Sequence, residues 1–142
     1  MKILNTTRKT LVANNAEIAD TFFFRMMGLL NRKSLKPQEA LIITQCQSIH
    51  MLFMKFPIDV IFISSHFTTS PASLPTDEDK TSKRGFEMAS NRSHQVVGLV
   101  KGIKPFCFSP LFFKANAAIE LPVNVIETSQ TQLGDSLHIL SN

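Results

Sequence analysis

The segment from Cys46 to Asp59 brings several chemically capable side chains into one apolar stretch. Cys46, Ser48, His50, Lys55 and Asp59 contribute a thiol, a hydroxyl, an imidazole, an amine and a carboxylate. Polar groups inside so apolar a run are costly to bury unless they find hydrogen-bond partners. This segment is therefore the first candidate for a functional site.

Two strands are expected to position these side chains. Residues 48–54 and 58–63 are rich in strand-forming apolar residues, and the residues between them would close a hairpin. Directly opposed residues in a hairpin have numbers with a constant sum, and an odd sum puts His50 and Asp59 on one face. Opposed Cβ atoms lie about 4.5–5.5 Å apart, within reach of an imidazole–carboxylate hydrogen bond. We hypothesise that this pair exists.

Two interpretations of the polar residues do not involve catalysis. In the first, Arg25, Arg32, Lys55 and His50 surround a pocket for a small anionic ligand, because an Arg side chain presents a planar fork to carboxylate or phosphate groups. In the second, Asp59 caps a turn or pairs with Arg25, and His50 satisfies its hydrogen bonds within the sheet. The sequence leaves both interpretations open.

An enzyme built on Cys46, His50 and Asp59 is the alternative. A nucleophilic cysteine in a hydrolase or transferase needs a neighbouring base. Residues four apart on a strand lie about 13 Å apart, so Cys46 and His50 would meet only if the chain folds back. The three residues also lack the spacing that is typical of metal sites, so no metal is expected. The sequence identifies no cofactor.

The composition indicates a globular chain of ordinary core content. The 142 residues are 44% hydrophobic, and a chain of this size buries roughly 68–70% of its unfolded surface. The net charge of +4 is too small to require a nucleic-acid or lipid partner, and we do not expect nucleic-acid binding. No signal peptide and no membrane span is recognisable, so we expect a cytoplasmic protein. A disulfide between Cys46 and Cys107 stays open.

The hydrophobic pattern predicts one helix and six or seven short strands. A helix is expected over about residues 15–30, where an Asn precedes Glu17 in a capping pattern and apolar residues recur at spacings of three and four. Short strands are expected near residues 11–12, 41–43, 48–54, 58–63, 95–100, 117–123 and 133–140. These elements predict a mainly β fold, a small antiparallel β-sandwich or barrel with one packed helix.

Residues 65–93 differ in composition from the rest of the chain. Ser, Thr, Pro and charged residues dominate, with few apolar residues to offset the entropy of ordering. We interpret this stretch as a long, disordered loop inserted into a hairpin of a single domain that spans residues 1–142.

The twelve phenylalanines are the main aromatic material, because the chain has no Tyr and no Trp. Phe106 and Phe108 are expected to anchor the turn-rich crossing between residues 102 and 110. Phe112 and Phe113 are expected to be partly exposed. A patch of exposed aromatic side chains would indicate an interface.

Three motifs, in this order, resemble those of a known family. They are Arg25-Met-Met-Gly-Leu-Leu-Asn-Arg32, then Cys46-Gln-Ser-Ile-His50 with Lys55-Phe-Pro-Ile-Asp59, and finally Ala118-Ile-Glu-Leu-Pro122 with Gly134-Asp135. The chain resembles the uncharacterised bacterial and archaeal family catalogued as domain of unknown function 192, of the uncharacterised protein family 0127 type. This resemblance implies a compact, mainly β fold of sandwich or barrel type and no particular reaction.

The chain departs from the family pattern at a few positions. Met51 stands where the matching branch usually has Thr, and Ala40 and Asn124 stand where it usually has Gly. Asn is the residue best able to replace Gly at positive φ, so Asn124 is expected to keep the turn.

The expected function is a non-catalytic binding or accessory module for a small anionic ligand or a protein partner. The alternative is the cysteine-based hydrolase or transferase. The candidate binding residues are Arg25, Arg32, Cys46, Ser48, His50, Lys55 and Asp59.

Overall fold

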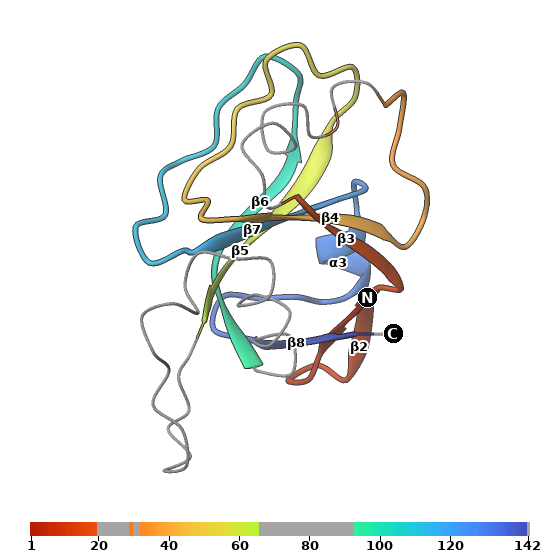
Figure 1. Cartoon of the computed structure of the whole chain (residues 1–142), viewed down its shortest axis with the longest axis vertical. Helices are drawn as coiled ribbons and strands as arrows, with labels where there is room; N and C mark the ends of the chain where they lie inside the picture. Colours follow the sequence, from red (N-terminus) through yellow and green to blue (C-terminus); the bar gives the residue numbers. More distant parts are fainter. Residues whose placement is uncertain (20–28, 30–31, 66–92, 142) are drawn as a thin grey trace.

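The computed structural model describes residues 1–19, 29, 32–65 and 93–141 (Figure 1). Within these ranges, eight strands form one sheet in the order β2-β1-β8-β6-β5-β7-β4-β3. The strands are β1 (Lys2–Asn5), β2 (Thr10–Ala13), β3 (Asn15–Ala19), β4 (Glu39–Thr44), β5 (Ile58–Ser65), β6 (Ser93–Ile103), β7 (Ala117–Leu121) and β8 (Ser136–Leu140). One short helix, α3 (Val125–Thr128), follows β7. The mainly β class predicted from the sequence is confirmed.

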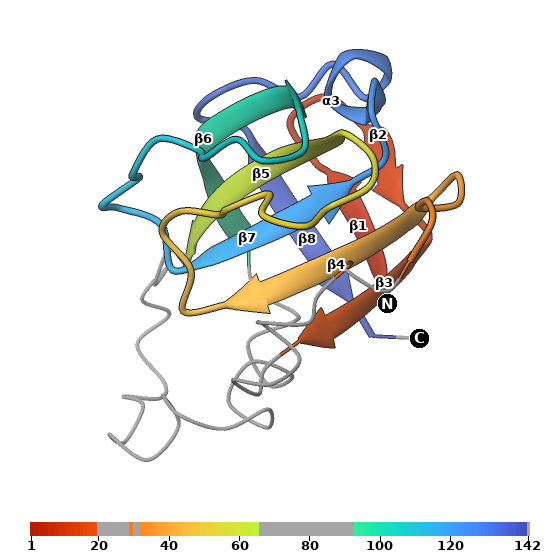
Figure 2. The same cartoon turned by 90° about the horizontal axis from the view of Figure 1, so that it is seen from above.

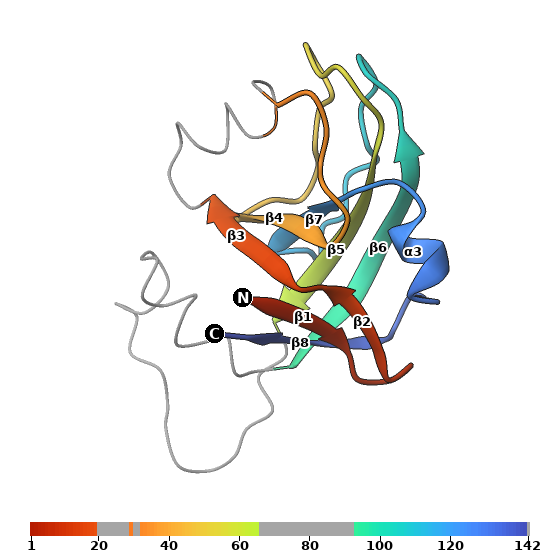
Figure 3. The same ribbon diagram turned by 90° about the vertical axis from the view of Figure 1, so that its right-hand side faces the viewer.

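The sheet curls until its two ends approach each other (Figures 2 and 3). Neighbouring strands are antiparallel, except that β3 and β4 run parallel. Strands β2 and β3 are separated by one residue, Asn14, yet they lie at opposite ends of the strand order. The backbone groups of Met1 and Ala16 exchange hydrogen bonds of 2.8 and 3.2 Å, which hold β3 near β1. The sheet is therefore barrel-like, but it is not closed into a barrel.

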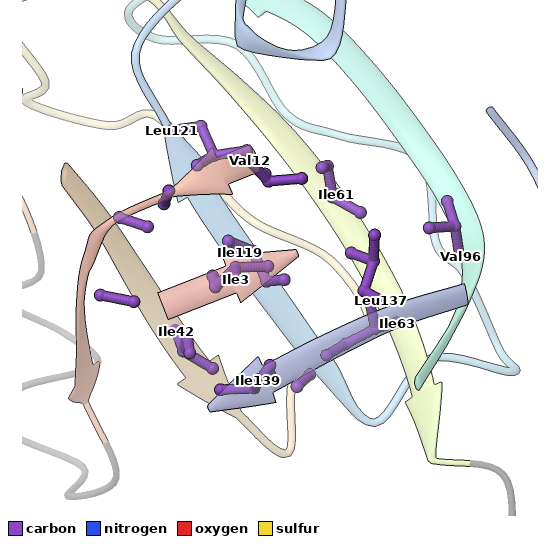
Figure 4. Close-up of a cluster of buried hydrophobic side chains, with 14 of the residues drawn as sticks. Ile3, Val12, Ile42, Ile61, Ile63, Val96, Ile119, Leu121, Leu137 and Ile139 are labelled. Atoms are coloured by element: carbon purple, nitrogen blue, oxygen red, sulfur yellow. The ribbon is translucent and has the colours of Figure 1, made fainter. Parts of the chain in front are cut away.

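An apolar core fills the inside of the curled sheet (Figure 4). Its fully buried isoleucines come from five strands and include Ile3, Ile42, Ile61, Ile119 and Ile139. β-branched side chains suit this position because they fit the surface of a pleated sheet.

A second apolar cluster lies on the outer face of the sheet. Val60 and Phe62 of β5 belong to it, whereas Ile61 and Ile63 belong to the inner core. This alternation follows from the two-residue period of a strand. Both faces of β5 are thus buried, which explains why its sequence is a continuous apolar run.

The helix predicted over about residues 15–30 is wrong at its start. Residues 15–19 form β3, and residues 20–28 and 30–31 lie outside the described residues. Ala16 pairs with Ala40 and Ile18 with Ile42 in the parallel β3–β4 ladder. Tertiary strand pairing therefore overrides the local capping pattern. The helix that the described residues contain is α3 at 125–128. No helix in the described part of the chain is long and apolar enough to cross a membrane.

The hairpin predicted between residues 48–54 and 58–63 is also wrong. Strand β5 pairs with β6 on one edge and with β7 on the other. Residues 48–54 form no strand, apart from an isolated bridge between His50 and Phe108. Residues 48–54 instead cover the outer apolar cluster, to which they contribute the buried side chains of Ile49, Met51 and Met54.

The predicted insert at 65–93 falls almost wholly on residues 66–92, outside the described residues. The strands on either side of it, β5 and β6, are antiparallel neighbours, with Ser65 opposite His94. The insertion point within a hairpin is therefore confirmed.

Candidate functional site

Asp59 holds the start of α3. Its Oδ1 accepts a hydrogen bond of 2.8 Å from the Gly102 N–H, and its Oδ2 accepts one of 3.0 Å from the Ile126 N–H. Ile126 lies in the first turn of α3, and the N-cap residue Asn124 makes no side-chain cap of its own. Asp59 is 2% exposed, and both its oxygens are occupied by backbone donors. This geometry matches the interpretation in which Asp59 caps a turn, and the hairpin meant to bring it to His50 is absent.

Arg32 is engaged at the β3–β4 edge of the sheet. Its guanidinium lies 3.1 Å from a Glu17 carboxylate oxygen and 3.5 Å from one of Glu39. Glu17 and Glu39 lie on β3 and β4. The other predicted arginine, Arg25, lies outside the described residues. Of the two arginines expected around His50, the described residues therefore include only Arg32, and its guanidinium is paired with carboxylates.

Cys46 and Cys107 form no disulfide with each other in the structure. Cys46 is half-buried, and its Sγ donates a hydrogen bond of 3.1 Å to the backbone carbonyl of Ser48. Cys107 is exposed.

Two loops lie side by side at one end of the molecule, and we name them loop A (residues 45–57) and loop B (residues 104–116) (Figure 1). Backbone hydrogen bonds of 2.8 Å run from Met51 N–H to the Cys107 carbonyl and from Phe106 N–H to the Met51 carbonyl. Further along, Ser109 N–H donates to the Ile49 carbonyl at 3.0 Å. The two loops therefore form an irregular ribbon that covers the outer cluster.

The outer surface of this ribbon is aromatic. Phe53, Phe106 and Phe108 are 72%, 63% and 68% exposed. The rings of Phe53 and Phe106 meet edge to face, with centroids 6.2 Å apart. The expectation that Phe106 and Phe108 anchor the crossing is wrong, because Ile49, Met51 and other residues of the ribbon already fill the inward positions. The half-buried Phe112 and the 77% exposed Phe113 agree with expectation.

Phe53 and Phe106 both have a backbone conformation that disfavours a large side chain. Their φ angles are 62° and 64°. Each is the third residue of a tight turn, one closed by Met54 N–H to the Met51 carbonyl and the other by Cys107 N–H to the Lys104 carbonyl, both at 3.2 Å. Gly is favoured at such a position, and an L-residue there costs about 1–2 kcal/mol. Two exposed aromatic residues therefore occupy places where Gly would fit better.

The two loops are basic. Loop A contains His50 and Lys55, loop B contains Lys104 and Lys114, and all four side chains are exposed. Neither loop contains an Asp or a Glu. We name the exposed basic and large apolar side chains of the two loops the loop surface: His50, Phe53, Lys55, Lys104, Phe106, Phe108, Leu111, Phe113 and Lys114. In the sequence, this surface corresponds to two segments that lack Asp and Glu and contain several Phe residues. Among those Phe residues, only Phe112 and Phe113 were expected to be partly exposed.

Glu120 is a buried acid on β7, beside Leu41 of β4 and Val60 of β5. Its Oε2 has no hydrogen-bond partner among the described residues. Burial in this apolar environment raises the pKa of Glu120 to about 7. By the two-residue period of the strand, Glu120 lies on the face of β7 opposite Ile119 and Leu121, which belong to the inner core. In the described part of the chain, no three His, Cys, Asp or Glu residues gather into a possible metal site.

Comparison with known proteins gives one family and one fold. The sequence profile of DUF192, described as "Uncharacterized ACR", matches residues 3–139. A UPF0127 protein of Thermococcus sibiricus is 29% identical over 139 residues, which cover 95% of this chain and 72% of that protein.

Two crystal structures share the fold. A protein of unknown function from Novosphingobium aromaticivorans has a TM-score of 0.66 at 15% identity, and the match covers 96% of this chain and 81% of that one. A protein from Sinorhizobium meliloti described as a "putative transcription regulator" has a TM-score of 0.64 at 14% identity, with coverages of 96% of this chain and 89% of that one. At these identities the likeness shows the fold alone.

Proposed function

The chain belongs to the DUF192 family, and we propose that it is a non-catalytic binding module whose loop surface recognises a partner with both apolar and anionic groups. The contact between Phe53 and Phe106 carries this proposal. Both rings are mostly exposed, so neither contributes much to the core, and both backbones are strained. Strain that serves no packing purpose is typical of functional sites.

The apolar part of the partner would contact the phenylalanine rings. His50 and Phe108 face each other across the bridge between the two loops, so their side chains lie on the same face of the ribbon. Phe106 precedes Phe108 by two residues in the same loop. An exposed apolar patch with a polar rim is typical of an interaction site.

The anionic part of the partner would contact the cations of the loop surface. Lys55 and Lys104 flank the two aromatic turns, and no carboxylate in either loop would repel an anion. Of the candidate binding residues named from the sequence, His50 and Lys55 therefore belong to the loop surface. Cys46 and Ser48 remain adjacent to the surface, whereas Asp59 and Arg32 have structural partners.

The cysteine-based hydrolase or transferase has less support. It needs Asp59 to orient His50, and both oxygens of Asp59 accept backbone hydrogen bonds elsewhere. A binding role does not require that pair.

Octyl phosphate below its micelle concentration is a suitable probe, because it combines one anionic group with one short apolar chain. We expect backbone amide NMR shifts to change in loops A and B when octyl phosphate is added. Octanol and inorganic phosphate are the matched probes, and each should cause smaller changes, since each offers half of the chemistry. Changes centred on Arg32 and its carboxylate partners instead would refute the proposal.

The variant Phe53→Gly/Phe106→Gly makes the test independent of folding. Gly suits the positive φ at both positions, so this variant should be at least as stable as the parent protein. It should nevertheless lose the shifts caused by octyl phosphate. Leu133→Ala is the matched control, because Leu133 is an exposed apolar side chain that lies in neither loop. Unchanged binding in the double Gly variant would also refute the proposal.

A further inference from the structure

We propose that the partner of the loop surface is an anionic lipid bilayer, onto which the protein docks by inserting the aromatic turns of loops A and B. This inference rests on the proposed binding function and names the partner. It concerns attachment to a bilayer surface and requires no spanning element.

The position of the aromatic turns suits insertion. The tips of the two loops lie together and project beyond the sheet at the same end of the molecule, which both Figures 1 and 3 show. The hydrogen bonds between Met51 and its two partners in loop B hold the tips as a unit. Phe53 and Phe106 therefore reach solvent from one pre-arranged point, and ordering them on binding costs little entropy.

Further apolar side chains would follow the two turns into the bilayer interface. Phe108, Leu111 and Phe113 of loop B are 68%, 50% and 77% exposed. Phe and Leu on one side with Lys beside them are the composition of segments that lie in a bilayer interface.

The charges of the loop surface favour an anionic bilayer. Lys55, Lys104 and Lys114 are exposed in the same two loops as the aromatic residues, and these loops carry no acidic residue. Lysines near a bilayer are attracted to anionic headgroups, and this attraction decays over a Debye length.

The same composition argues against the other macromolecular partners. Protein interfaces are enriched in aromatic residues, Met and Arg and depleted in Lys. The exposed cations of the two loops are Lys and His, with no Arg, and the lysines suit an anionic bilayer better than a protein partner. Single-stranded nucleic acid binds along a positively charged groove that tracks its backbone, and the described residues offer two loop tips instead.

Vesicle co-sedimentation with the full chain tests the proposal. Vesicles of phosphatidylcholine containing one-third phosphatidylglycerol should bind the protein, and pure phosphatidylcholine vesicles should bind it at least tenfold more weakly. Raising the salt concentration should weaken binding to the anionic vesicles, because screening reduces the attraction of the lysines. Equal binding to both kinds of vesicle, or no binding to either, would overturn the proposal.

Variants separate insertion from charge. Phe53→Gly/Phe106→Gly should reduce binding to anionic vesicles by at least about a hundredfold, because each fully buried Phe side chain contributes about tenfold or more. Lys55→Gln/Lys104→Gln should reduce that binding and weaken its salt dependence. Lys36→Gln is the matched control, an exposed lysine in neither loop, and it should change little. Vesicle binding that survives the double Gly substitution would contradict the inference.

The failure of this inference differs from the failure of the proposed function. If octyl phosphate binds at the loops but anionic vesicles do not, the bilayer is excluded and the binding module stands. If neither binds, both are refuted. Sedimentation velocity adds a further outcome: a dimer that forms in the parent protein and not in Phe53→Gly/Phe106→Gly would assign the loop surface to a second copy of the chain and overturn the bilayer proposal.

Discussion

The carboxylate of Asp59 on β5 accepts a 3.0 Å hydrogen bond from the backbone N–H of Ile126 in α3. The two residues are distant in the sequence, and the bond replaces a local cap that Asn124 does not provide. Asn124 has a φ of 71°, which confirms the expectation that it keeps a turn where the family usually has Gly. A strand residue and a positive-φ turn thus act together to begin the helix.

This arrangement predicts a structural effect of substituting Asp59. Asp59→Ala leaves the Gly102 and Ile126 N–H groups without their acceptor, so the free energy of unfolding should fall by about 1–3 kcal/mol. Urea denaturation measures this change. The octyl phosphate shifts should persist under native conditions, because Asp59 does not belong to the loop surface.

Glu127→Gln is the matched control for Asp59. Glu127 is exposed and its ion pair with Lys101 is on the surface, where such pairs contribute little to stability. A variant at Asp59 that keeps the parent stability but loses ligand binding would return Asp59 to the binding site and contradict the capping role.

The raised pKa of Glu120 predicts that the free energy of unfolding decreases as the pH rises from 4.5 to 7. Its pKa is about 7 in the folded state and 4.5 when unperturbed, so between these values the folded state holds the proton more tightly than the unfolded state. The associated stability is fully present below pH 4.5 and is lost as the pH rises through 7, a total of about 3 kcal/mol. Urea denaturation across this range measures the slope.

Glu120→Gln should remove this contribution, because Gln does not titrate. The variant should be more stable than the parent protein above pH 7 and should show a flatter profile between pH 4.5 and 7. Glu17→Gln, which changes an exposed carboxylate that pairs with Arg32, should leave the slope in place. An unchanged slope in Glu120→Gln would show that another group is responsible.

The sequence predicted the β class because most strands carry a local signal. The alternation at residues 117–123 and the apolar runs at 41–43 and 58–63 correspond to β7, β4 and β5. Strand β3 could not be predicted in this way, because an Asn followed by a Glu looks like a helix start and only its parallel pairing with β4 makes it a strand.

The proposed site has a local sequence signal for part of its residues but none for its geometry. The motif around His50 and Lys55 does contribute exposed residues to loop A. The outward direction of Phe106 and Phe108 depends on which residues cover the outer cluster, and Ile49 and Met51 reach it from another part of the chain. The destination of the Asp59 carboxylate likewise depends on Ile126, far along the sequence. Long-range packing of this kind leaves no local pattern.

The two cysteines should differ in reactivity in the order opposite to that expected of a cysteine enzyme. Cys107 is exposed, whereas Cys46 is half-buried with its thiol donating to the Ser48 carbonyl. A thiol-specific reagent at neutral pH should therefore label Cys107 faster than Cys46, since access limits the rate. Cys46→Ser and Cys107→Ser assign the two phases. Faster labelling of Cys46, with a rate that depends on His50, would revive the nucleophile.

The Phe112 ring of loop B packs against Gly98 of the sheet. A Cβ atom built on Gly98 of β6 would lie 2.7 Å from the Cγ of Phe112. The Phe112 ring also packs against Phe62 of β5, with centroids 4.4 Å apart. The absence of a side chain at residue 98 therefore makes the space in which the ring of loop B lies.

Gly98→Ala should displace the Phe112 ring and lower the free energy of unfolding by about 1–3 kcal/mol, as overpacking does. In a Phe112→Ala background the same substitution should cost little, because the opposing ring is gone and the two effects are then non-additive. Urea denaturation of the parent protein, both single variants and the double variant measures this coupling. Because the displaced ring belongs to loop B, Gly98→Ala should also weaken the octyl phosphate shifts. Additive effects of the two substitutions would mean that the ring does not hold loop B through this contact.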